Sequence, residues 1–274
     1  MNFIEKIIFG IDSWKMTTPG NFGLFHILSV LLCAGVTVAI CIFFKNAKDK
    51  TMRRIALISW IIMVSLEIMK QLIYSYDGNA LEWDYQWYAF PYQLCSTPMY
   101  VLPFIAFMKD CKVRDAAMAY MSTFSFFGGL AVFIYPNDVF ISTAVINFQT
   151  MIHHGLQIVL GIYFFIYNRK KLSFKYFLGA VFFFVALAVL AIILNEIVHA
   201  SLVARGNDET FNMFYFSPHH GTHLPILSII CPLVPPVVFI FIYVIGFMIA
   251  ALAVFYAMVG IKKLVSICRN AKTN

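Results

Sequence analysis

Seven histidines are the side chains of this 274-residue chain best suited to proton transfer or metal binding near neutral pH. Each falls near one end of a stretch that is expected to cross a membrane, so we expect all seven to share one side of the bilayer. They are His26, His153, His154, His199, His219, His220 and His223. This arrangement predicts a polar site just below one membrane surface.

Cys95 is the candidate nucleophile, because it lies in a polar stretch at the start of an expected helix, where the helix dipole favours an anion such as a thiolate. His153 and His154 begin another apolar stretch at a similar depth. A cysteine with a histidine base is the basis of covalent acyl transfer. The alternative is that Cys95 only fills space in the core, as free cysteines commonly do.

The two adjacent histidines differ in the direction that they face. Gln149, His153 and Gln157 are spaced by four residues and define one helix face, whereas His154 lies about 100° round the helix. Only one of the two histidines can therefore point at a given centre, and the other faces a neighbouring helix or the lipid headgroups.

A polar stripe lies within another expected membrane helix. Glu67, Lys70, Gln71 and Tyr74 occur at i, i+3, i+4 and i+7, which places them on one face. Ionisable groups at membrane depth are costly and are therefore candidates for function. Two interpretations stay open: a Glu67 to Lys70 ion pair that locks the helix, or a role in binding substrate.

Polar residues also end the sixth expected helix, where Asn195, Glu196 and His199 can share a face. Glu196 could orient His199 as a carboxylate orients a catalytic imidazole, but a polar helix cap has the same pattern. Further along, His219 and His223 have the spacing of metal ligands on a helix. Their loop contains proline and glycine and lacks a partner carboxylate, so we predict a flexible loop that contacts headgroups, with no metal and no cofactor.

The elements that position these residues follow from composition. With 61% hydrophobic and 12% charged residues, the chain is too apolar for an ordinary soluble domain, so we predict an all-α polytopic membrane protein with about seven transmembrane helices. The third is the least regular, because prolines interrupt it, and a broken or re-entrant segment is the alternative. The expected spans lie near residues 24–44, 55–76, 93–108, 116–135, 149–167, 174–198 and 235–260. Residues 1–274 then form a single integral membrane domain, with 1–20 an interfacial segment and 200–234 an outer loop or cap.

Positive charge sets the predicted orientation. Of the 20 lysines and arginines, 16 lie in connections on one side, near residues 45–54, 109–114, 169–175 and 262–272. By the positive-inside rule the C-terminus is cytoplasmic and the N-terminus is outside. The net charge of +7 is thus a signal of topology and not of nucleic-acid binding. Membrane lipids are the expected partners, and the cell membrane is the expected location.

Several short motifs together resemble a known family. They are Pro91-Tyr92-Gln93-Leu94-Cys95, His154-Gly155, Asn212-Met213-Phe214-Tyr215 followed by Pro218, and Cys231-Pro232-Leu233-Val234-Pro235. In spacing and order they resemble the YwaF-like bacterial integral membrane family, which is related to the eukaryotic transmembrane-protein-164 acyltransferases. The resemblance covers most of the chain and implies a location in the bacterial cytoplasmic membrane.

The resemblance implies a heptahelical enzyme that transfers fatty acyl groups between phospholipids of the outer leaflet, or hydrolyses them, with Cys95 and His154 as the catalytic residues. The bacterial relatives tend to have histidine where this chain has Gln93, which changes the expected local proton relay. The residues expected to bind substrate or the developing oxyanion are Gln93, Ser96, Thr97, Glu67, Lys70, Gln71, His153, Glu196, His199 and Asn212.

Function without catalysis is the alternative. Seven spans with an external N-terminus also match receptors and transporters, and the polar stripe could bind a small ligand. A retinal protein is disfavoured, because residues 235–260 contain no lysine for a Schiff base. A transporter built from inverted repeats would often show a matched pair of interrupted spans, which this sequence lacks. A disulfide between Cys95 and Cys231 is also conceivable.

Overall fold

The computed structural model describes residues 1–136 and 139–270, so Lys272 of the basic C-terminal tail lies outside the described residues. Within these ranges, six helical segments are long and apolar enough to cross a membrane, which confirms the prediction of an all-α, multi-pass membrane protein. They are α2 (Leu24–Phe44), α3 (Asp49–Ser75), the continuous segment α5 (Lys112–Tyr120), η3 (Met121–Ser125) and α6 (Phe126–Ile134), α7 (Ala144–Tyr167), α8 (Phe174–Ala204) and α10 (Pro236–Asn270).

The third predicted span is shorter than the others. It consists of the 3-10 turn η2 (Leu94–Ser96) and the ten-residue helix α4 (Pro98–Phe107). Ten residues extend about 15 Å, which is half of the roughly 30 Å of hydrocarbon. Pro98 starts α4 at a position where a missing N–H costs nothing. The irregular chain before it leaves Cys95 at the head of a half-length helix.

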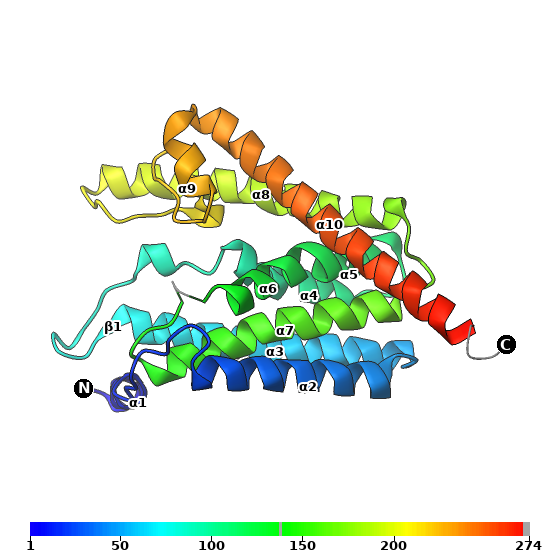
Figure 1. Cartoon of the computed structure of the whole chain (residues 1–274). Coiled ribbons are helices and arrows are strands. Elements are labelled where there is room, and N and C mark those ends of the chain that lie inside the picture. Colours follow the sequence, from blue (N-terminus) through cyan, green and yellow to red (C-terminus); the bar gives the residue numbers. More distant parts are fainter. Residues whose placement is uncertain (137–138, 271–274) are drawn as a thin grey trace.

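The remaining elements are short and lie towards one end of the bundle, the end that contains the N-terminus (Figure 1). They are α1 (Phe3–Asp12), the paired strands β1 (Tyr76–Asp77) and β2 (Glu82–Trp83), η1 (Trp87–Ala89), η4 (Met213–Tyr215), α9 (Leu227–Ile230) and η5 (Cys231–Leu233). Because α8 continues to Ala204, beyond its expected end near residue 198, the predicted outer cap begins later. We use "the cap" for residues 205–235.

The long helices form two layers with a third group between them (Figure 1). Helices α2, α3 and α7 lie on one side, α8, α9 and α10 lie on the other, and α4, α5 and α6 lie between. Glycine allows α6 and α7 to approach closely: a Cβ on Gly129 would lie 2.7 Å from the carbonyl oxygen of His154. This contact fixes the depth of α7 against α6 at the level of the two histidines.

The fourth span contains a π-helical turn, η3, in its middle. Such single turns are rare within regular helices and are frequently found at functional sites. Two hydroxyls fill the turn, because Ser122 Oγ donates to the carbonyl of Met118 at 2.8 Å and Thr123 Oγ1 donates to that of Ala119 at 2.7 Å. The ring of Phe124 stacks on Phe184 of α8 at 4.3 Å between centroids. Met121 and Phe124 of this turn are fully buried within the main apolar core.

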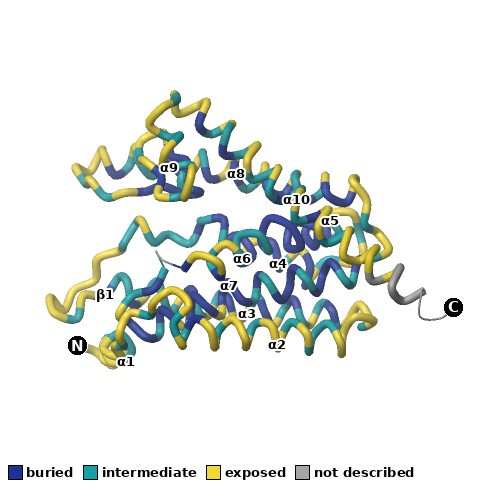
Figure 2. Tube along the Cα trace, viewed as in Figure 1, coloured by how far each residue is buried: buried dark blue, intermediate teal, exposed yellow. Residues whose placement is uncertain are grey.

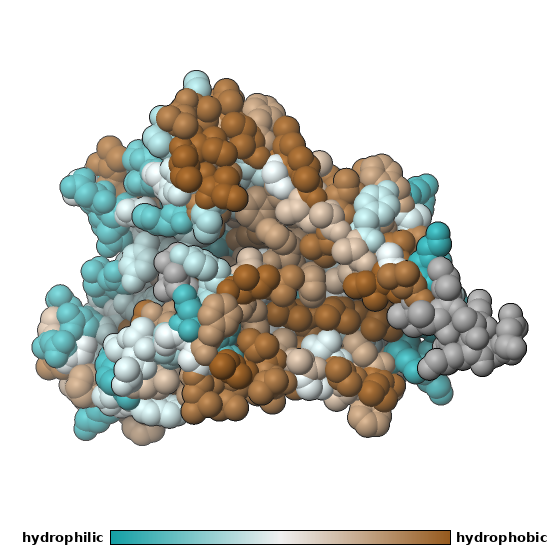
Figure 3. Space-filling view, viewed as in Figure 1, coloured by the Kyte–Doolittle hydropathy of each residue, from teal (hydrophilic) through white to brown (hydrophobic). Residues whose placement is uncertain are grey.

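The outer surface of the bundle is apolar in the middle and polar at the ends. Residues of α2 and α10 face outward along most of their length, which exposes large side chains such as Leu32, Phe43 and Phe241 (Figure 2). The space-filling view shows apolar residues over the middle of the visible face and hydrophilic residues towards its two ends (Figure 3). A bilayer would cover the apolar band.

Three of the basic connections come together at one end of the bundle. Arg169 donates to the carbonyl of Lys45 at 3.0 Å, and Lys171 pairs with Asp110 at 3.2 Å. The described C-terminal part of α10 reaches this basic end, whereas the N-terminal helix α1 lies at the opposite end (Figure 1). The side of the membrane that each end faces stays a prediction.

Candidate functional site

The polar face of α7 holds the backbone of Cys95. His153 Nε2 lies 3.1 Å from the carbonyl oxygen of Cys95, and Gln157 Nε2 donates to the same oxygen at 2.9 Å. Because a carbonyl can only accept, Nε2 of His153 carries the proton. The structure thus brings together the predicted cysteine and histidines, but the hydrogen bonds from α7 run to the carbonyl and not to the thiol.

His154 is oriented by its own helix. Its Nδ1 lies 2.8 Å from the carbonyl oxygen of Thr150, so Nδ1 carries the proton and Nε2 is a bare lone pair in the neutral ring. Nε2 is buried and has no protein partner among the described residues. The ring of His153 lies 5.8 Å away, and its Nδ1 is likewise a buried acceptor without a partner. Each ring therefore presents one nitrogen that can take up a proton.

In the part of the chain that the structure describes, two amide oxygens on the segments that meet at the Cys95 carbonyl are also unsatisfied. Gln93 donates through Nε2 to the carbonyl of Asn212 at 2.8 Å, but its Oε1 is buried without a partner among the described residues, and so is Oε1 of Gln157. An unsatisfied buried polar group costs free energy, so such groups are uncommon in native proteins. Four buried acceptors on four neighbouring residues are therefore a concentration that suits a ligand with donor groups.

The backbone around Cys95 offers donors of the opposite kind. The N–H groups of Ser96 and Thr97 donate to the carbonyls of Gln93 and Leu94, within the turn. Within the described part of the chain, the N–H of Leu94 makes no backbone hydrogen bond, as expected at the first turn of a helix, and the N–H of Cys95 lies beside its own thiol. These two groups can stabilise a negative oxygen that develops at Cys95.

Of the two hydroxyls predicted to donate there, one is already engaged. Thr97 is fully buried, and its Oγ1 lies 2.6 Å from the carbonyl of Leu94 and 2.5 Å from the hydroxyl of Tyr120. Thr97 therefore holds the start of α4 against α5. The hydroxyl of Ser96 lies within reach of the Cys95 side chain. Ser96 is better placed than Thr97 to act near the thiol.

The polar stripe of α3 forms the ion pair that its spacing suggests. Lys70 Nζ lies 2.7 Å from Glu67 Oε1, and Gln71 Nε2 donates to the same oxygen at 2.8 Å and to the carbonyl of Ala89 at 2.7 Å. Glu67 is only 4% exposed, so its charge needs this pairing. The Lys70 ammonium lies close enough to act electrostatically on Cys95, His153 and His154. The stripe thus locks the helix and also borders the site.

Two asparagines attach the cap above this region. Asn195 of α8 is fully buried, accepts from the N–H of Met213 at 2.7 Å and donates to its carbonyl at 3.1 Å. Asn212 accepts from the N–H of Ser217 and donates to the carbonyl of Gly221, both at 2.8 Å. A role of Asn212 in binding substrate stays a prediction; its side chain organises the cap, and its carbonyl accepts from Gln93.

Glu196, near the end of α8, contacts a different histidine from the one that was expected. Glu196 Oε2 lies 3.2 Å from Nε2 of His219 in the cap, and His199 stacks on the same ring at 3.7 Å between centroids. His220 meets His199 edge-on at 5.8 Å. The sequence could not show this, because only the folded cap returns residues 219 and 220 to α8. We therefore replace the suggested Glu196 to His199 contact with a stacked cluster of three histidines.

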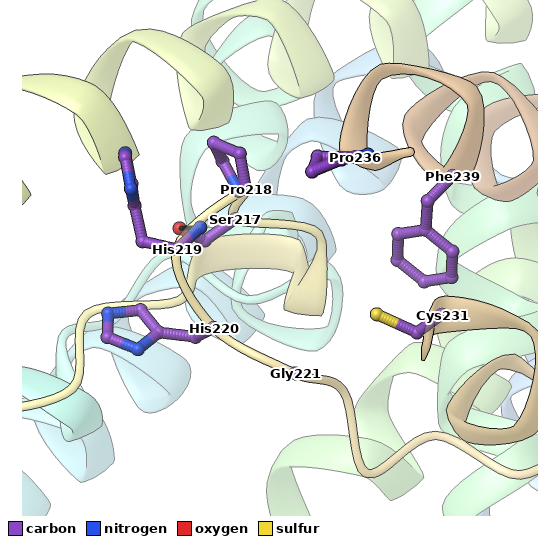
Figure 4. Close-up of a pocket in the computed structure, with 8 residues that line it drawn as sticks. All are labelled: Ser217, Pro218, His219, His220, Gly221, Cys231, Pro236 and Phe239. Atoms are coloured by element: carbon purple, nitrogen blue, oxygen red, sulfur yellow. Dashed lines mark hydrogen bonds between the residues drawn. The ribbon is translucent and has the colours of Figure 1, made fainter. Parts of the chain in front are cut away.

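A cavity of about 270 Å³ lies beside this cluster (Figure 4). The ring of His219 turns towards α8, and the sulfur of Cys231 points into the space under Phe239 of α10. Burial, with smaller effects from His199 and His219, lowers the pKa of His220. Cys231 and Cys95 are both free thiols, so the conceivable disulfide between them is not formed. His223 is exposed on the cap.

The hydrogen bonds of His26 give this histidine a structural role. The ring is 1% exposed, its Nδ1 accepts from the N–H of Phe22 at 3.0 Å, and its Nε2 donates to the carbonyl of Phe133 at 2.9 Å. Both nitrogens are satisfied in one neutral tautomer. His26 therefore fastens the start of α2 to the end of α6 and is not part of the candidate site.

Sequence reasoning missed two contributions to the site. Gln157 was placed on the face of His153 but was not assigned a role, although its amide holds the Cys95 carbonyl. The four-residue spacing from His153 was the available signal. Thr150 orients His154 through a backbone carbonyl, for which a sequence carries no residue-specific signal.

Comparison with known proteins gives one match. The model of the TMEM164 family matches residues 21–259, from the residues just before α2 to near the end of α10. The matched region includes every residue of the candidate site. The chain shows no significant match to a curated protein or to a solved structure.

Proposed function

Because the chain belongs to the TMEM164 family, we propose that it is a membrane-embedded acyltransferase in which Cys95 carries the acyl group as a thioester. The resemblance of its motifs to acyltransferases suggests the class of reaction. The observation that supports it best is the buried lone pair on Nε2 of His154, beside the ring that holds the Cys95 carbonyl. A thiol needs such a base to become a nucleophile at neutral pH.

In the first half of the proposed reaction, His154 Nε2 takes the proton of the Cys95 thiol. The thiolate attacks the ester carbonyl carbon of a phospholipid, forming a carbon–sulfur bond and a tetrahedral oxyanion. The N–H groups of Leu94 and Cys95 stabilise that oxyanion. The intermediate then breaks its carbon–oxygen bond, and the leaving lysophospholipid oxygen takes the proton from His154.

In the second half, the hydroxyl of an acceptor lysolipid attacks the thioester. His154 removes the hydroxyl proton as the new carbon–oxygen bond forms, and the proton returns to the sulfur when the thioester breaks. Water in place of the lysolipid would give hydrolysis. Lys70, paired with Glu67, contributes positive potential near the reacting atoms without leaving a buried charge uncompensated.

The sharpest test is a covalent adduct on one thiol. The full-length protein is reconstituted in phosphatidylcholine vesicles that carry a radiolabelled sn-2 acyl chain, and label is sought on the protein as a hydroxylamine-sensitive thioester. We expect wild type to be labelled and Cys95→Ala to lose the label. Cys33→Ala is a matched control, because the Cys33 thiol also lies beside α7, 3.7 Å from the carbonyl of Gly155.

Equal labelling of wild type and folded Cys95→Ala would exclude Cys95 as the nucleophile. Lipid binding without an adduct in any variant would instead favour the non-catalytic alternative, a transporter or ligand-binding protein. The buried ion pair of Glu67 and Lys70 is the feature that such a protein would use. In that case Lys70→Gln should weaken lipid binding, whereas Cys95→Ala should not.

A further inference from the structure

A second cavity, of about 530 Å³, lies at the basic end of the bundle. Three connections that are far apart in the sequence surround it: the turn between α2 and α3, the turn between α4 and α5, and the end of α7. Its lining includes Lys45, Asp49, Arg114, Arg169 and Lys170. The cavity is at the opposite end of α7 from His153 and His154, so it is separate from the candidate site.

The acidic groups around this cavity are already committed to partners. Arg114 is buried and contacts Asp49 at 2.7 Å and Asp110 at 2.9 Å. Lys171 contacts Asp110 at 3.2 Å and Asp115 at 2.9 Å. In the described ranges, none of the ion pairs involves Lys45, Arg169 or Lys170. The cavity therefore has an excess of positive charge.

Arg169 is held in place by neutral groups. Its Nη1 donates to the carbonyls of Lys45 at 3.0 Å and Ile166 at 3.1 Å, and its Nη2 donates to Asn46 Oδ1 at 2.8 Å. These contacts use three of the five N–H donors of a guanidinium. They fix the group in space without neutralising it, and they leave two donors for an anion. Lys262 Nζ donates to the Arg169 carbonyl at 2.6 Å and adds a further positive charge beside it.

Arg114 supplies a second sign that the cavity is built for an anion. Its Nε–H is buried and, among the described residues, has no acceptor, although both of its terminal nitrogens are engaged. The positive-inside rule accounts for lysines on exposed connections. That rule does not explain why Arg114 is buried between two carboxylates. It also does not explain why the Arg169 guanidinium donates to groups of another connection.

We propose that this cavity binds a phosphate group, carried either by an anionic phospholipid of the adjacent leaflet or by a soluble phosphate ester. Planar guanidinium groups match the geometry of phosphate oxygens, and lysines add charge without fixed direction. Lys45 and Lys170 are exposed at the rim of the cavity and attract the ligand, whereas Arg169 and Arg114 set its position.

Two paired variants test the proposal in the full-length protein. Lys45→Gln with Lys170→Gln removes two charges from the cavity. Lys109→Gln with Lys175→Gln removes two charges from exposed positions at the same end that do not line it. Among the described residues, the side chains of these four lysines make no hydrogen bonds. Arg169 donates to Lys45 only at its backbone carbonyl, which the substitution keeps. The variants are purified in an uncharged maltoside detergent.

The probes separate the two sources of phosphate. Native mass spectrometry measures binding of dioleoyl phosphatidylglycerol against dioleoyl phosphatidylcholine, and thermal unfolding measures stabilisation by inorganic phosphate. We expect the cavity pair to weaken binding at least about fivefold and the control pair to change it less than about twofold. Binding of phosphatidylglycerol alone identifies a lipid site, and stabilisation by inorganic phosphate identifies a soluble ligand.

Equal weakening in the two pairs would overturn the proposal, because it would show diffuse attraction to the basic surface and no site. Equal binding of both lipids together with no response to inorganic phosphate would also overturn it. An Arg169→Lys variant adds a check on geometry: it keeps the charge but loses the planar donor fork, and we expect it to weaken binding about as much as the cavity pair.

Discussion

The two ends of the bundle differ in the charge of their buried polar groups and in how many of these groups have protein partners. At the basic end, Arg114 is compensated by two carboxylates, and Arg169 is held by carbonyl and amide oxygens. At the histidine end, His153, His154, Gln93 and Gln157 keep four buried acceptor atoms that have no partner in the described ranges. At the basic end, charged contacts connect three segments of the chain. At the histidine end, neutral groups are available to a ligand.

This difference shows where the fold gains stability and where it can support chemistry. Ion pairs with exposed carboxylates contribute little each, but a shared buried arginine joins several connections at once. Unsatisfied acceptors reduce stability, so they persist where the surrounding structure holds them. Variants at the histidine end should therefore change reactivity first, and variants at the basic end should change stability or anion binding first.

The largest expected effect separates the two adjacent histidines. His154→Gln removes the proposed base and should slow acyl transfer by about 10²–10⁴-fold with little loss of stability. His153→Gln keeps an amide N–H where Nε2 donates to the Cys95 carbonyl, so most of the rate should persist. Single-turnover transfer from labelled phospholipid measures both. The reverse ranking would make His153 the base.

The close contact of α6 with α7 gives the next largest effect. In Gly129→Ala, the added Cβ would lie 2.7 Å from the His154 carbonyl and 2.8 Å from Gln157 Cβ, and such overpacking costs about 1–3 kcal/mol. Thermal unfolding in detergent should show the loss together with slower acyl transfer. Gly246→Ala in α10 is the control, because nothing lies within 4 Å of its new methyl group. It should not destabilise the protein.

At the basic end, Arg114→Met should lower stability by about 1–2 kcal/mol without changing acyl transfer. The loss is smaller than for a fully buried pair, because the side chains of Asp49 and Asp110 are 48% and 66% exposed and can be hydrated. Lys112→Met, an exposed change in the same turn of α5, should have almost no effect on the unfolding temperature. Equal effects would mean that the network adds no stability.

The smallest expected effect is a difference in pH response between the ends. The pKa of His220 is lowered in the folded state, so its contribution to stability is complete above the unfolded value of about 6.5 and declines as the pH falls. The pKa of Asp110 is lowered mainly by its hydrogen bond from Lys171, so that contribution declines only below about pH 4.

Hydrogen exchange, corrected for its intrinsic pH dependence, measures this difference. Between pH 7.5 and 5.5, residues 205–235 should lose protection while the turn between α4 and α5 should not. The groups that face His220 across the cluster are His199, His219 and, through His219, Glu196. His220→Gln should remove most of the change. Loss of protection at both ends would contradict the assignment to His220.

The sequence predicted the parts of the fold that depend on local pattern. Long apolar runs gave the six spans, prolines indicated the irregular third segment, and the i, i+3 spacing indicated the Glu67 to Lys70 pair. These features depend on helix geometry alone. The grouping of basic residues at one end also followed from counting charges along the chain.

The contacts that the sequence could not predict depend on backbone groups or on returning loops. The Cys95 carbonyl that binds His153 and Gln157 has no residue-specific signal, because every residue has a carbonyl. Glu196 meets His219 and not His199, because the cap folds back over α8. The candidate site residues could thus be named from the sequence, but their partners required the tertiary structure.

Because of the π-helical turn η3, the fourth span is continuous but is not one regular α-helix. A π turn accommodates an additional residue, and one residue of an α-helix corresponds to a rotation of about 100°. Helices α5 and α6 therefore have different rotational registers along one axis. Deleting one residue from 121–125 should merge them into one register and turn Gly129 away from His154, so this single extra residue controls which face of α6 meets the part of α7 that carries the two histidines.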